Sequence, residues 1–163
     1  MTSHRCRLLV AALMTGALGS ATVVAQSGEK RITPGEVNWP SAAAAAVGTS
    51  GAAGIQTVVL KGDPTKPGLY TLLLRVGPNT RIAAHAHPDD RVATVVSGTW
   101  YFGYGNTFSE SGLKALPAGS FYTEPPNANH FAMTKQEGVV IQISGIGPSG
   151  TTYVDPQNDP TRK

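Results

Sequence analysis

The fold of this chain is decided by one stretch, Gly77-Pro-Asn-Thr-Arg-Ile-Ala-Ala-His-Ala-His-Pro-Asp-Asp-Arg91. It contains His85 and His87, two of the three histidines that follow the first 25 residues. On an extended strand, residues two apart project from the same face, so both rings can approach one metal ion. The third histidine, His130, comes at the end of a second block, residues 117–129, whose pattern predicts a strand and a tight turn.

Short apolar or β-branched runs recur on both sides of this stretch, separated by glycine and proline, which is typical of an all-β fold. Ser97-Gly98 predicts a hairpin between two of these runs, with Trp100, Phe102 and Tyr104 on one face as core residues. No convincing helix follows the N-terminal segment, so the pattern predicts a double-sheet jelly roll. The expected strands are 56–61, 69–76, 81–87, 91–96, 99–104, 113–116, 120–124, 129–133, 138–145 and 151–154.

The length and composition fit one domain with a packed core. The chain has 163 residues, of which 40% are hydrophobic and 14% charged, with 19 Gly and 12 Pro. Once Arg5 and Arg7 are removed with a leader, 11 of the 13 basic residues remain against 10 acidic ones. The mature chain has no basic run interleaved with aromatics, so we expect no nucleic-acid partner.

The N-terminus has the pattern of a secretory signal peptide, residues 1–25. A short basic segment, Met1 to Arg7, precedes an apolar segment of small residues that ends at Ala25. Cleavage there would leave a periplasmic or secreted protein without cysteine and without a stable membrane anchor. The alternative is an uncleaved anchor helix, which Gly16 and Gly19 disfavour.

Three further regions follow the leader. Residues 26–54 are rich in Pro, Ala and Gly, and we interpret them as an N-terminal arm laid over the barrel through Val37 and Trp39, or alternatively as a flexible linker. Residues 55–155 would form the barrel, and the polar tail 156–163 would lie on the surface.

The two histidine blocks resemble the paired motifs of the cupin superfamily, over roughly Val58 to Val154. The first follows H-x-H-x3-E-x6-G from His85 to Gly98, except that Arg91 replaces the glutamate. The second has Pro117-Ala-Gly119 with a histidine eleven residues after the glycine. The resemblance implies an RmlC-like jelly-roll barrel, also called a double-stranded β-helix, and a homodimer is a family expectation.

The resemblance also implies a divalent metal on His85, His87 and His130 with one side of the ion open. Imidazole ligands suit Zn, Fe, Ni, Cu or Mn, so the residues do not select the metal. Alternatively, the three rings are structural and satisfied by backbone partners. Arg91 cannot ligate a metal, and beside one it would require a carboxylate or an anionic substrate between them.

Glu124 is the best-placed carboxylate, because it belongs to the same block as His130. It could be a fourth ligand, an acid/base catalyst beside an Arg91 that holds a substrate carboxylate or phosphate, or a residue of a rim salt bridge. Gln142, on an apolar strand, could hydrogen-bond a ligand in the cavity or could be a core glutamine bonded to backbone. Asp89 and Asp90 are interpreted as turn formers.

These residues favour a domain that binds a divalent metal and a small, anionic organic ligand in the barrel mouth. If the protein is an enzyme, the resemblance implies a metal-dependent oxygenase, isomerase or lyase. A non-catalytic binding or sensing module and a metal-free structural barrel are the alternatives, and sequence leaves the enzyme question open.

The signal-peptide interpretation predicts that the mature chain begins at Gln26 or within a few residues of it. Intact-mass measurement of the protein from the envelope fraction tests this directly. A mass that includes Met1 would replace the signal peptide with an anchor.

Overall fold

The computed structural model describes residues 28–41 and 46–162. The chain divides into two units, residues 1–32 and residues 33–163, and the fold below is that of the second. The predicted signal peptide lies outside the described residues. Within the described ranges, no helix has both the length and the apolar character needed to span a membrane.

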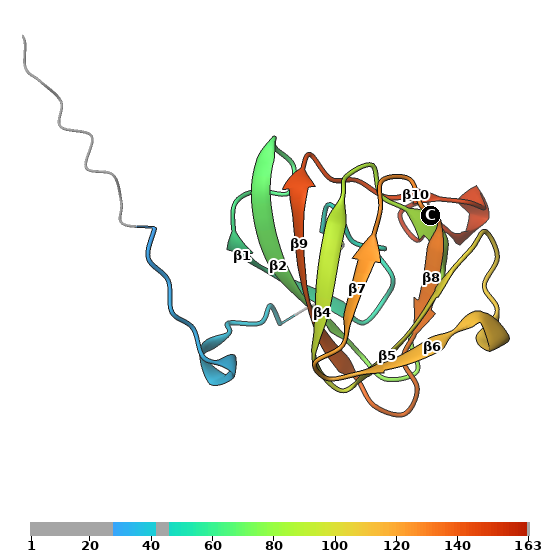
Figure 1. Ribbon diagram of the computed structural model, residues 1–163, viewed down its shortest axis with the longest axis horizontal. Coiled ribbons are helices and arrows are strands. Elements are labelled where there is room, and N and C mark those ends of the chain that lie inside the picture. Colours follow the sequence, from blue (N-terminus) through green and yellow to red (C-terminus); the bar gives the residue numbers. More distant parts are fainter. Residues whose placement is uncertain (1–27, 42–45, 163) are drawn as a thin grey trace, which may run out of the picture. The chain divides into compact units, whose positions relative to one another are not determined.

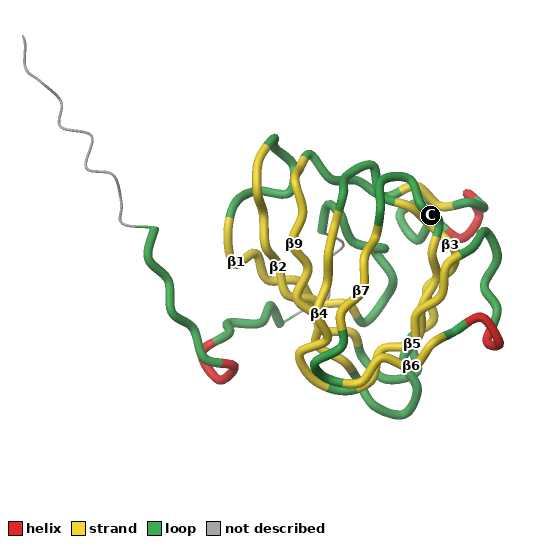
Figure 2. The backbone as a smooth tube through the Cα atoms, viewed as in Figure 1, coloured by secondary structure: helices red, strands yellow, loops and turns green. Residues whose placement is uncertain are grey.

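The second unit consists of two antiparallel sheets of five strands each, which lie on the left and right of Figures 1 and 2. One sheet has the order β1-β2-β9-β4-β7 and the other β10-β3-β8-β5-β6. The described helices are single 3-10 turns: η1 (Pro34–Glu36), η2 (Glu110–Gly112) and η3 (Pro156–Asn158). The strands are β1 (Ile55–Lys61), β2 (Gly68–Val76), β3 (Arg81–Ala86), β4 (Arg91–Ser97), β5 (Thr99–Tyr104), β6 (Lys114–Pro117), β7 (Phe121–Glu124), β8 (His130–Met133), β9 (Val139–Gly147) and β10 (Thr152–Tyr153). The predicted all-β jelly roll is confirmed.

The core lies between the inner faces of the two sheets. Along β2 and β9 the inward positions alternate with outward ones, and the registers place Leu72 opposite Ile143 and Leu74 opposite Ile141. Trp100 and Phe102 of the second sheet are buried against the same cluster. Each such side chain contributes roughly 1.5–3 kcal/mol when fully buried, so the apolar cluster is the main source of stability in a domain without disulfides.

The predicted hairpin between β4 and β5 is wrong. β4 pairs with β7 and β9, whereas β5 pairs with β6 and β8, so the chain passes from one sheet to the other at Gly98. Tyr104 also departs from the prediction, because it is 55% exposed and its hydroxyl donates a hydrogen bond to the Thr123 carbonyl at 2.7 Å. A period-2 pattern gives the face of a strand but not the strand with which it pairs.

The described part of the N-terminal arm contacts β1 and β2 through two interactions. The Arg75 guanidinium lies over the Trp39 ring, 4.0 Å from its centroid. The Gln56 side-chain amide donates to the Pro40 carbonyl at 2.6 Å. Val37 is half-buried. Farther along, Thr49 and Ser50 are buried.

Gly98 and Gly119 both have positive φ, +75° and +87°, and they provide a matched test of the crossing between the sheets. A Cβ on Gly119 would meet nothing within 4 Å, so Gly119→Ala should cost only the backbone penalty of roughly 1–2 kcal/mol. A Cβ on Gly98 would lie 2.3 Å from the Gly138 carbonyl oxygen, so Gly98→Ala should cost a further 1–3 kcal/mol or so. Urea unfolding of both variants measures the difference, and equal losses would contradict the tight crossing.

Candidate metal site

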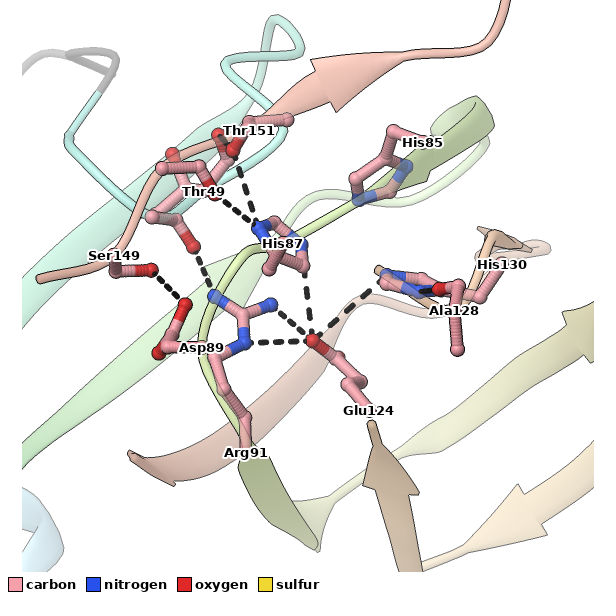
Figure 3. Close-up of polar contacts among 12 residues, drawn as sticks. Thr49, His85, His87, Asp89, Arg91, Glu124, Ala128, His130, Ser149 and Thr151 are labelled. Atoms are coloured by element: carbon pink, nitrogen blue, oxygen red, sulfur yellow. Dashed lines mark hydrogen bonds and ion pairs between the residues drawn. The ribbon is translucent and has the colours of Figure 1, made fainter. Parts of the chain in front are cut away.

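Three buried histidines converge at one end of the barrel (Figure 3). His85 of β3 lies directly opposite His130 of β8 in the register of the second sheet. His87 comes just after β3 ends, two residues from His85. One ligand atom from each ring lies within 4.8 Å of the others, which is the only such group among the described residues.

The ring nitrogens of these histidines have fixed roles. Each Nδ1 lies within hydrogen-bond distance of a backbone carbonyl, which can only accept, so Nδ1 must carry the proton. Each Nε2 therefore keeps a free lone pair, which is the form of imidazole that binds a metal. The carbonyl partners are Ala83 for His85 (2.8 Å), Gly150 for His87 (2.6 Å) and Ala128 for His130 (3.0 Å).

Arg91 and Glu124 form a buried ion pair beside the histidines. They lie opposite each other in the register of β4 and β7. The Arg91 Nε donates to Glu124 Oε2 at 2.8 Å, and Nη2 donates to the same oxygen. Nη1 donates to the carbonyl of Gly48. Both residues face the cavity, so the structure brings together the two charged side chains that the sequence singled out.

Burial and the ion pair determine the charges in this group. Burial lowers the pKa of His85 to about 4, helped by neighbouring His130, and burial with Arg91 lowers that of His87 to about 2. Burial also lowers the pKa of His130. Burial alone would raise the pKa of Glu124, but Arg91 together with His130 and His87 outweighs it and brings the value to about 2. The site at neutral pH therefore holds neutral imidazoles, one carboxylate and one guanidinium.

The geometry of this set leaves a place for a cation. Glu124 Oε2 lies 3.7 Å from Nε2 of His87 and 3.8 Å from Nε2 of His130. With Nδ1 protonated, neither Nε2 carries a proton, so lone pairs face a carboxylate oxygen with no hydrogen between them. Tetrahedral ligands about 2.0–2.1 Å from one ion are roughly 3.3–3.4 Å apart, so the Glu124 oxygen lies within a few tenths of an ångström of ligand spacing from these two nitrogens.

The cavity at the site is small. Its volume is about 40 Å³, enough for a few water molecules. The polar end is formed by the histidines, Arg91 and Glu124, and the apolar wall comes from both sheets. Residues Gly48–Ser50 also border it. Their role at the cavity could not be predicted from residue types, because they act through backbone carbonyls, which are common to every residue type.

Asp89 is more than the turn former that the sequence predicted. It is buried and accepts hydrogen bonds from the Tyr70 hydroxyl at 2.6 Å and from the Ser149 hydroxyl at 2.7 Å, whereas Asp90 is exposed. Ser149 precedes Gly150, whose carbonyl orients His87. Asp89 thus fixes the loop that holds a candidate ligand, and the partners involved are too distant in sequence for a local pattern to reveal.

Gln142 does not line the cavity, so that prediction is wrong. On β9 its neighbours Ile141 and Ile143 are buried and face inward. Alternation then places Gln142 on the exposed outer face of the first sheet. The apolar character of the strand indicated that one of its faces is buried, but it did not show which residues lie on that face.

Comparison with known proteins identifies the family of this barrel. The family model that matches is described as the ChrR Cupin-like domain, and the match covers residues 41–148. No curated protein is similar enough in sequence to match.

Solved structures share the fold at low sequence identity. The polyketide cyclase RemF from Streptomyces resistomycificus has a TM-score of 0.59 at 16% identity, covering 81% of this chain and 89% of that chain. An RmlC-like cupin from Shewanella frigidimarina NCIMB 400 has a TM-score of 0.52 at 18% identity, covering 72% and 90%. A structure of the DMSP lyases RdDddP and RnDddQII has a TM-score of 0.52 at 21% identity and covers 61% of this chain, which spans only 52% of that one. These likenesses show the fold alone.

The buried ion pair predicts a specific pattern of stability. Arg91→Met and Glu124→Gln should each destabilise the fold by about 3–5 kcal/mol, because each leaves the charge of the partner buried without its counter-charge. The double variant should lose less than the sum of the two. Urea unfolding of all three proteins gives the coupling energy. Additive losses would show that the two side chains do not depend on each other.

Proposed function

Because the chain belongs to the ChrR cupin-like domain family, we propose that His85, His87 and His130 together hold one divalent metal ion through their Nε2 atoms. The observation that carries the proposal is the hydrogen bonding of all three Nδ1 atoms to backbone carbonyls. That arrangement leaves three Nε2 lone pairs directed to one small cavity, with protons held on the opposite nitrogens, which is the form of imidazole that binds a metal.

Glu124 and Arg91 have distinct roles in this proposal. Glu124 Oε2 is close enough to His87 and His130 to become a fourth ligand or to exchange a proton with a metal-bound molecule. Arg91 holds this carboxylate in its ionised form and in one orientation. The metal, when bound, would supply Lewis-acid activation of a small ligand. The donor set suits Zn, Fe, Ni, Cu or Mn.

The ligand proposed for this metal is a small molecule with a negative charge. Arg91 gives the site a permanent positive charge, and the carboxylate of Glu124 balances it. The positive charge of a bound metal then has no counter-charge in the protein, so it attracts an anionic ligand. Both an enzyme and a sensing module would use such a site. Steady consumption of a ligand by the metal-loaded protein would favour the enzyme, and binding without turnover would favour the sensor.

Removal of single histidines tests the metal site. His85→Ala and His130→Ala should each lower metal affinity by about 100-fold or more, since even the loss of an outer hydrogen-bond partner costs 10–100-fold. The measurement is metal content of untagged protein together with metal dissociation constants. Circular dichroism should show the same β fold in both variants. Gln142→Ala, on the outer face, is the control and should bind metal normally. Full metal content in either histidine variant would place the ion elsewhere.

A further inference from the structure

The backbone of Gly48–Ser50 is fixed at the cavity by three consecutive carbonyl groups. Each carbonyl accepts a hydrogen bond from a different side chain of the barrel, and Thr49 and Ser50 are each only 7% exposed. The donors are Arg91 Nη1 to Gly48, Thr151 Oγ1 to Thr49 (2.8 Å) and the Tyr153 hydroxyl to Ser50 (2.5 Å). Figure 3 shows Thr49 beside Thr151 and His87. These three residues are called the plug below.

The plug borders a small cavity at the candidate metal site. The cavity is about 40 Å³, whereas pockets for organic ligands are commonly about 300–1,000 Å³. A metal with one or two water-sized ligands fits such a cavity, and a larger organic molecule does not.

The plug also accepts a hydrogen bond from Arg91. Nε and Nη2 both bond Glu124, so Nη1 is the guanidinium nitrogen that reaches the plug, at Gly48. A carbonyl oxygen carries a partial negative charge, and a carboxylate or phosphate oxygen is a stronger acceptor for the same N–H group. An anionic ligand that binds this same N–H group must displace the Gly48 carbonyl.

We propose that Gly48–Ser50 determines which ligands the site accepts: in place, it admits only water-sized ligands, and an organic anion binds by displacing the Gly48 carbonyl from Arg91. This proposal rests on the metal-binding function proposed above. It adds that a segment of the chain itself sets the size limit and competes with an anion for Arg91. Loss of the hydrogen bonds that hold the plug should then help large anions and leave small ones unaffected.

The test compares azide with malonate on the full mature protein loaded with Co²⁺, followed by the cobalt absorption spectrum. Tyr153→Phe removes the donor to Ser50 but keeps the ring, which should increase the fraction of open plug about fivefold. Malonate affinity should increase by the same factor, while azide affinity stays constant. Tyr104→Phe is the matched control, because its hydroxyl also donates to a carbonyl but on the exposed side of the barrel. Equal malonate affinity in wild type and Tyr153→Phe would overturn the proposal.

Hydrogen exchange of the Thr49 amide separates failure of this proposal from failure of the metal site. That amide donates to the Ala46 carbonyl at 3.1 Å, so its exchange rate reports opening of the plug. Malonate should accelerate this exchange with or without metal, because Arg91 is the group for which it competes. Absence of bound metal alone would contradict the proposed function. If malonate binds but the Thr49 amide does not exchange faster, the proposal about the plug is wrong, whether or not the protein contains metal.

Discussion

The buried pair of Arg91 and Glu124 is the interaction on which the rest of the site depends. Removing both charges from water costs several kcal/mol for each, and only close, multiple hydrogen bonds can offset that cost. The antiparallel register of β4 and β7 provides them by placing the two residues directly opposite each other. The pair keeps the carboxylate ionised, and its single engaged oxygen faces two imidazole nitrogens. One strand register thus sets both the position and the charge of the site.

The histidines depend in turn on backbone groups from several segments. The β3–β8 register brings His85 and His130 together, and local carbonyls two residues before each ring fix the proton on Nδ1. His87 differs, because its carbonyl comes from Gly150, in a loop that Asp89 secures through Ser149. Movement of that loop would change the orientation of His87 and leave the other two rings in place. The site is therefore held by local backbone groups on the β3–β8 side and by a distant loop at His87.

Local residue spacing was enough to predict the strands and the converging histidines. It was not enough to predict which strands pair over long distances in the sequence. The interval between His85 and His87, and the turn residues before His130, identified the fold and the rings that converge. Alternation and turn signals located all ten strands among the described residues to within about two residues. The hairpin at Gly98 and the inward orientation of Gln142 were wrong, because neither strand partner nor phase follows from one strand's own residues. The plug could not be foreseen, since any residue supplies a carbonyl.

Replacement of the motif glutamate by Arg91 changes the charge that a bound ligand would meet. In the cupin motif that position adds one negative charge to three neutral imidazoles around the metal. Here Glu124 restores a carboxylate from the neighbouring strand, but Arg91 cancels it, so the site with a metal would be one unit more positive than with a glutamate alone. Among side chains as buried as these, this difference would be screened weakly and would favour an anion over a neutral ligand. The same guanidinium holds the Gly48 carbonyl, so the charge that attracts an anion also closes the site against large ones.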